Sequence, residues 1–148
     1  MASINDMFSG KWFRRDVITI LGFLVLQFIL GMVLNLFVAF PSIPAGSSDR
    51  TYFNAILTTP FLLAHFIVGV GLLLGSIWII ISAARIRKRK VLPLALLGFV
   101  SILTAYVSGF EFLLSGFQSN VMSFTMSIGF VAALISYFAL FHQSGRLK

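Results

Sequence analysis

The chain has 148 residues, of which 59% are hydrophobic and 10% are charged, and its net charge is +7. A soluble globular protein carries roughly 25% charged residues, so this composition excludes an ordinary water-soluble domain and indicates that lipid is the solvent. The chain contains no cysteine, which excludes disulfides, cysteine-ligated zinc or iron–sulfur centres and thiol nucleophiles. The basic residues stand at the ends of apolar runs, a placement typical of membrane topology and not of nucleic-acid binding.

Four apolar runs are long enough to cross the ~30 Å hydrocarbon core, which takes about 20 helical residues. Because every backbone N–H and C=O must be paired within the bilayer, the runs are predicted to be helices. These helices are expected at about 17–40, 57–84, 91–115 and 119–142. The sequence therefore predicts an all-α polytopic membrane protein, a four-transmembrane-helix up-down bundle in which residues 1–148 form a single domain.

The residues between the runs support these boundaries. Pro60 and Pro93 each fall in the first turn of a run, where a missing N–H costs little. Gly116 ends the third run just before the short turn 116–118, which makes the third and fourth helices antiparallel neighbours. The longest loop, 41–56, has 16 residues, and we expect it to be too short to fold by itself.

The Lys and Arg residues fall almost entirely on one side of the four predicted spans. The N-terminal segment, the 85–90 loop and the C-terminal tail together carry ten of the eleven, and Arg50 falls on the other side. The positive-inside rule therefore predicts that both termini and the 85–90 loop are cytoplasmic, in the plasma (cytoplasmic) membrane. The five basic residues of this loop are expected to contact anionic headgroups: Arg85, Arg87, Lys88, Arg89 and Lys90. Two aromatic pairs are expected in the interfacial belts: Trp12 with Phe13, and Tyr52 with Phe53.

Polar side chains inside the spans are expensive in lipid and are therefore candidates for function. The ionisable ones are His65 and Glu111, and the amides are Gln27 and Asn35. Counted from the predicted outer ends of their helices, Asn35, His65 and Glu111 lie at depths of roughly 8, 12 and 6 Å, at ~1.5 Å per residue. Two serines share this layer, so the sequence predicts an intramembrane polar cluster in the outer third of the bilayer: Asn35, His65, Ser108, Glu111 and Ser123.

His65 is the centre of this predicted cluster. It shares a helix face with small residues, which favours a packed interface, so we expect the imidazole to face the interior of the bundle. One nitrogen is expected to be hydrogen-bonded to Asn35, Ser108, Ser123 or a backbone carbonyl. The other nitrogen would then be open to a ligand or to Glu111. The alternative is that His65 only holds the helices together.

Three classes of function remain open. The leading hypothesis is an accessory or structural subunit of a larger membrane complex, such as a redox or energy-converting one. Its expected partners are the lipid bilayer and other membrane subunits or further copies of the chain, and no nucleic acid. The sequence lacks motifs such as G-x-S-x-G, H-E-x-x-H and a phosphate loop, so no catalytic residue is predicted and an enzyme is not favoured.

The second hypothesis is a haem- or metal-binding membrane protein. His65 is the candidate ligand, because a neutral imidazole is a common ligand of haem iron and transition metals. His142 falls at the opposite, cytoplasmic end, so the second axial position would fall to Met126, a weaker candidate, or to a histidine from a partner chain. Glu111 could also join His65 on a divalent metal. A small transporter or channel subunit is the third hypothesis, ranked lower because the inner halves of the helices offer few polar side chains.

Overall fold

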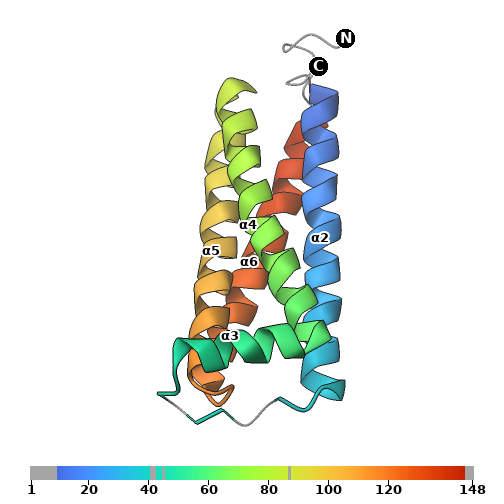
Figure 1. Ribbon diagram of the computed structural model, residues 1–148. Coiled ribbons are helices and arrows are strands. Elements are labelled where there is room, and N and C mark those ends of the chain that lie inside the picture. The colour runs from blue at the N-terminus through green and yellow to red at the C-terminus, as the bar shows by residue number, and fades with distance from the viewer. Residues whose placement is uncertain (1–9, 41–42, 45, 87, 146–148) are drawn as a thin grey trace.

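The computed structural model describes residues 10–40, 43–44, 46–86 and 88–145, and the regular structure within them is entirely helical (Figure 1). The helices found there are α2 (Gly10–Phe37), α3 (Asp49–Thr58), α4 (Pro60–Ile86), α5 (Val91–Leu114) and α6 (Asn120–Ser144). All except α3 are long and apolar enough to cross a membrane. The predicted fold class, an all-α four-transmembrane-helix up-down bundle, is confirmed.

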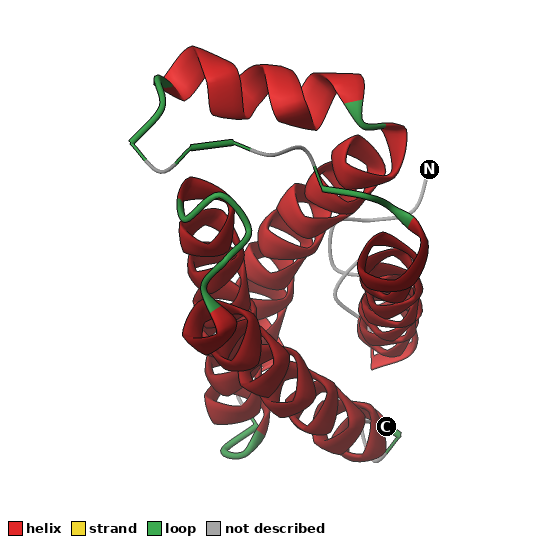
Figure 2. Cartoon of the chain, turned by 90° about the horizontal axis from the view of Figure 1, so that it is seen from below, coloured by secondary structure: helices red, strands yellow, loops and turns green. Residues whose placement is uncertain are grey.

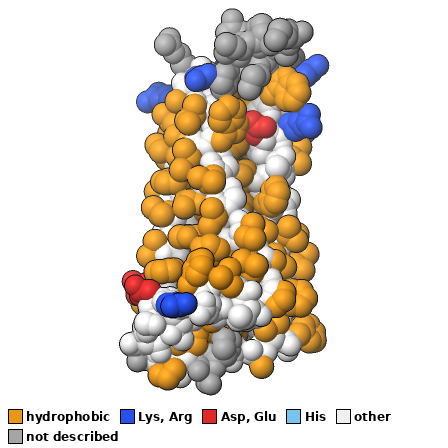
Figure 3. All heavy atoms as spheres, in the orientation of Figure 1, with side chains coloured by type: hydrophobic (Ala, Val, Ile, Leu, Met, Phe, Trp, Pro, Cys, Tyr) orange, Lys and Arg blue, Asp and Glu red, His pale blue; other side chains and the backbone are white. Residues whose placement is uncertain are grey.

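The four long helices run alternately up and down and close into a ring. In this ring α4 packs between α2 and α5, and α6 packs between α5 and α2. One end of the bundle holds the start of α2 and the end of α6, and we call it the basic end; the other is crossed by α3, and we call it the α3 end. Lys and Arg side chains gather mainly at the basic end, with hydrophobic side chains covering the face between the two ends (Figure 3). Three basic residues used in the topology prediction lie outside the described residues: Arg87, Arg146 and Lys148.

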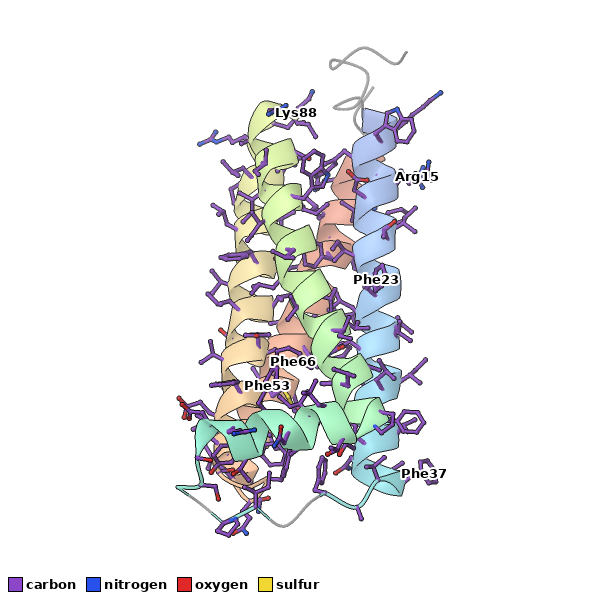
Figure 4. All side chains as sticks on the ribbon, viewed as in Figure 1. Arg15, Phe23, Phe37, Phe53, Phe66 and Lys88 are labelled. Atoms are coloured by element: carbon purple, nitrogen blue, oxygen red, sulfur yellow. The ribbon has the colours of Figure 1, made fainter. Side chains whose placement is uncertain are left out.

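Helix α2 begins before its apolar run, because its first turns are held by aromatic contacts. The Arg14 guanidinium lies over the Phe141 ring of α6, 4.8 Å from the centroid, and that of Arg15 lies 5.3 Å from the Trp12 ring centroid. Phe13 is buried in the core, so its predicted place in an interfacial belt is wrong, whereas Trp12 is exposed. Arg15 and Lys88 lie at the basic end, and Phe37 and Phe53 at the α3 end (Figure 4).

The predicted loop between the first two spans contains a helix, α3, that the sequence did not predict; it forms in contact with the bundle, so the expectation that this segment is too short to fold by itself stays a prediction. Helix α3 runs crosswise at the α3 end, along the edge formed by α4 and α5 (Figures 1 and 2), and packs against α4. Tyr52, Ala55 and Ile56 form its buried face, at the spacing of one helical stripe. The Tyr52 hydroxyl donates to the carbonyl oxygen of Leu114 at 3.0 Å. Tyr52 is therefore a packing residue of α3, while Phe53 is exposed.

The half of the bundle near the basic end is filled by a continuous core. Its largest fully buried side chains include Phe13, Val17, Ile79, Tyr137 and Leu140. The indole N–H of Trp78 donates to the Asp16 carboxylate at 3.0 Å and joins α4 to α2. Helices α5 and α6 approach closely at Gly129, where an added Cβ would lie 2.9 Å from Ala105 N and 2.9 Å from Ser101 O. The long helices are therefore held together by close packing, as membrane helices require.

Candidate functional site

His65 and Gln27 form a side-chain pair between α4 and α2. Gln27 Nε2 lies 3.0 Å from His65 Nε2 and donates to it, so the imidazole proton sits on Nδ1. Turning the amide by 180° exchanges donor and acceptor and keeps the pair. The expected partners of His65 were Asn35, Ser108, Ser123 or a backbone carbonyl, and the partner in the structure is Gln27 instead.

Two glycines make room for this pair. A Cβ added to Gly31 would lie 3.4 Å from His65 Cε1, and one added to Gly69 would lie 3.3 Å from Gln27 Nε2. Each glycine stands four residues after the polar residue of its own helix and contacts the polar residue of the other helix. The two segments read QFILG (27–31) and HFIVG (65–69), so the antiparallel helices present the same pattern to each other.

Each member of the pair keeps one buried polar atom without a hydrogen-bond partner within the described residues. These atoms are His65 Nδ1 and Gln27 Oε1. In the orientation described, the first carries a donor hydrogen and the second is an acceptor; with the amide turned, the two roles are exchanged. A buried group left unpaired costs about 1–3 kcal/mol, and the hydrocarbon core offers no water to compensate. The pair can therefore donate one further hydrogen bond and accept one further hydrogen bond.

A cavity of about 430 Å³ adjoins the pair, in the half of the bundle near the α3 end. Small-molecule sites in proteins typically enclose ~300–1,000 Å³. All four long helices contribute to the wall, which is mostly apolar. Its aromatic members include Phe28, Phe66, Tyr106, Phe110, Phe112 and Phe130. The cavity is therefore of the right size and composition for a small, largely apolar molecule.

Large apolar side chains line the cavity toward both ends of the bundle. At the α3 end its wall includes Ile56 of α3, together with Phe40 and Phe117, whose rings stack with centroids 4.5 Å apart. Toward the basic end its wall includes Leu24 and Leu72, which are buried members of the continuous core. The geometry is that of a pocket within the bundle rather than a passage through it.

The residues of the predicted polar cluster are divided by the structure. Asn35, His65 and Ser123 line the cavity, and Ser108 and Glu111 are not part of its wall. Ser108 is buried elsewhere on α5, and Glu111 is exposed. Helices α2, α4 and α6 therefore each contribute one residue of the predicted cluster to the cavity wall. The two predicted residues of α5 do not line the cavity.

The predicted ligand residues are divided in the same way. Met126 lines the cavity, and its sulfur lies 3.2 Å from the position of a Cβ on Gly109 of α5. In the part of the chain that the structure describes, no three His, Cys, Asp or Glu side chains come together. Glu111 is exposed and outside the cavity wall, so the structure does not bring it to His65 as a second metal ligand. His142 lies near the end of α6 at the basic end, away from the cavity.

Counting residues from the helix ends does not pair His65 with Gln27, because the helices end at different levels. Helix α4 begins only after α3 has crossed the bundle, whereas α2 continues past the level of α3 (Figure 1). The helix α3 therefore shifts the start of α4 away from the end of α2 by about the thickness of one helix, 8–10 Å. This shift corresponds to the rise of about six helical residues. The signal that could have found the pair is the shared spacing of QFILG and HFIVG.

The fold and the cavity together define the class of protein: a four-helix membrane bundle with one polar pair in the wall of an apolar internal pocket. In comparisons with protein-family models, curated proteins and solved structures, the chain matches none of them. The pocket itself is therefore the basis for inferring a function.

Proposed function

We propose that the protein binds a small, membrane-soluble molecule in the cavity beside His65 and Gln27. The observation that carries this proposal is the unused donor and acceptor of the pair next to about 430 Å³ of mostly apolar space. Protein interiors are close-packed, so an unfilled cavity loses packing contacts along its wall, and the two unpaired polar atoms add the cost of unmade hydrogen bonds. An occupant that fills the space and pairs the two atoms removes both costs.

The wall of the cavity restricts the chemistry of this molecule. Aromatic and aliphatic side chains call for an apolar body. The pair calls for a hydrogen-bonding group: a hydroxyl can serve both unpaired atoms, and a carbonyl can serve the donor. His65 Nδ1 and Gln27 Oε1 are both covered by their neighbours. Contact with the molecule therefore requires a turn of the imidazole or of the amide, for which the adjoining cavity provides space.

Gly31→Leu is expected to remove the bound molecule, because the new side chain occupies the space of the His65 ring. The matched control is Gly22→Leu on the same helix, where nothing lies within 4 Å of an added Cβ. Both variants and the unaltered protein are purified in detergent and extracted with organic solvent, and the extracts are compared by mass spectrometry. A compound lost only from Gly31→Leu supports the proposal, and equal extracts from all three proteins would sink it.

A haem held by His65 and Met126 is a second candidate, because both residues line the same cavity. In the structure His65 Nε2 is bonded to Gln27 and Nδ1 is covered, so ligation requires His65 to leave Gln27. Visible spectra of the oxidised and reduced protein decide between the candidates. A Soret band that disappears in His65→Leu favours haem, and a colourless protein with an extractable compound favours the first proposal.

The role of accessory subunit, which the composition favours, stays a prediction and is compatible with a ligand pocket. Phe37 and Phe124 are 80% and 67% exposed and offer apolar surface to lipid or to neighbouring helices. Isolation in a mild detergent tests this role: other membrane subunits would accompany the chain, and a lone chain would count against it. A transporter or channel has less support, because the core fills the basic half of the bundle.

We also propose that the basic end faces the cytoplasm, because seven of the eight Lys and Arg residues in the described part of the chain belong to it. The native chain has no cysteine, so an engineered one reports its side without interference. A membrane-impermeant thiol reagent added to intact cells is expected to label Ser48→Cys, at the start of α3, and to spare Lys88→Cys. Labelling of Lys88→Cys alone would reverse the orientation.

A further inference from the structure

Helices α2 and α6 diverge toward the α3 end. Near the basic end they are joined by Arg14 over the Phe141 ring, and farther along by Phe28 stacked on Phe130, with centroids 5.5 Å apart. Beyond this stacked pair α6 lies beside α5 and away from α2 (Figure 2). The cavity wall there includes exposed side chains from both helices: Met32 and Asn35 on α2, and Ser127 on α6.

Five of the six exposed residues of the cavity wall belong to α2 and α6 and the sixth is Phe110 of α5, so an opening between α2 and α6 accounts for most of this exposure. Met32 and Ser127 both lie within helices that are long and apolar enough to cross a membrane, so an opening between them faces lipid. Toward the α3 end the cavity wall is formed by Ile56 of α3 and by the stacked rings of Phe40 and Phe117. A molecule that enters through this opening reaches His65 sideways, out of the bilayer.

We infer that the cavity opens to the bilayer between α2 and α6, and that its ligand is a tailed molecule with a flat polar head beside His65 and Gln27. The apolar tail leaves through the opening, past Phe28 and Phe130, into the leaflet on the α3 side. This inference rests on the proposed function and names the class and the route of its ligand.

The chemical class that fits is that of the lipid-soluble quinones. Their flat ring suits an aromatic wall that includes Phe66 and Tyr106, whose ring centroids lie 6.3 Å apart. A quinone carbonyl can accept from the N–H of His65, and the hydroxyl of the reduced form can donate to Gln27 Oε1. Both forms of the head therefore find a partner in the same pair, while the tail needs only apolar surface.

Two engineered thiols can close the opening. Met32 and Ser127 each lie about one turn from the Phe28–Phe130 pair on the side of the α3 end. Met32→Cys with Ser127→Cys, joined by a bifunctional thiol reagent, therefore spans the opening. The control is Phe124→Cys with Ile128→Cys, because these exposed residues stand one turn apart on α6 and take the reagent without spanning it. The probes are decyl-benzoquinone and its tail-less counterpart duroquinone, with binding and release followed by chromatography of the protein–probe complex.

Linking the empty protein is expected to abolish uptake of decyl-benzoquinone, and linking the loaded protein is expected to trap it. The linked control should load and release the probe like the unlinked protein. Uptake by the linked, empty protein at the rate of the control overturns the route. Equal affinity for duroquinone overturns the placement of the tail, and unlinked protein that binds neither probe overturns the quinone class. The solvent-extraction experiment decides the proposed function separately.

Discussion

Gly129→Leu is expected to lower the free energy of unfolding by at least about 3 kcal/mol, the upper part of the usual range for overpacking. An added Cβ at this position would lie 2.9 Å from Ala105 N, 2.9 Å from Ser101 O and 3.1 Å from Ala105 Cβ. Two of these neighbours are backbone atoms within a helix, which cannot turn aside as a side chain can. Helices α5 and α6 must therefore separate to admit the leucine.

Unfolding of the purified protein by added denaturing detergent, followed by circular dichroism, measures this effect. Ile128→Leu is the matched control, because Ile128 is the preceding residue and is 53% exposed. The control should unfold like the unaltered protein. An unchanged transition for Gly129→Leu would contradict the close approach of α5 and α6.

A double-mutant cycle on His65 and Gln27 is expected to give single variants that are less stable than the double variant. His65→Leu leaves the Gln27 amide without its partner, and Gln27→Leu leaves both imidazole nitrogens unpaired. Each single change should cost about 1–3 kcal/mol, whereas replacing both polar partners by apolar groups can be nearly neutral. The coupling between the two sites should fall within about 0.5–3 kcal/mol, the usual range for residues in direct contact.

The double variant separates stability from function, because it restores the packing and removes the hydrogen-bonding groups. It should therefore fold normally and lose the extractable compound. Strictly additive single effects would mean that the two residues do not act as a pair. A double variant that keeps the compound would mean that another part of the cavity wall recognises it.

The four spans could be predicted from the sequence because their signal is length and apolar composition, which the bilayer imposes on any spanning helix. Pro60 is the first residue of α4, and Pro93 lies in the first turn of α5, as predicted. The start of α2 could not be found in this way. Its first turns carry Lys11, Arg14 and Arg15, and they are held by aromatic rings rather than by burial in lipid.

Helix α3 escapes prediction because it has only ten residues and helices of this length are marginal by themselves in water. It forms because Tyr52, Ala55 and Ile56 find a surface on the end of the bundle. Local signals were nevertheless present: Ser48 occupies the N-cap position and Asp49 the first turn. These signals predict a helix only when they are combined with the helical spacing of Tyr52, Ala55 and Ile56.

The candidate site could be predicted in part. His65 and Asn35 were found because polar side chains are rare inside apolar runs, and both line the cavity. Glu111 was selected by the same criterion and is exposed, because composition does not tell which side of a helix faces the interior. The partnership of His65 with Gln27 depends on the relative levels of α2 and α4, and α3 sets that offset.

The reciprocal fit of QFILG on HFIVG also fixes the register of α2 on α4. Sliding one helix by a single turn, about 5.4 Å, would replace Gly31 by Gln27 or Asn35 opposite the imidazole and would break the hydrogen bond to His65. The shift would remove both the packing of Gly31 on the imidazole and the hydrogen bond between His65 and Gln27. Each loss disfavours the shifted alignment of the two helices. Because α2 and α4 are the first two spans of the chain, this hairpin can align in the bilayer before α5 and α6 are synthesised, and the later helices then close around a site that is already in register.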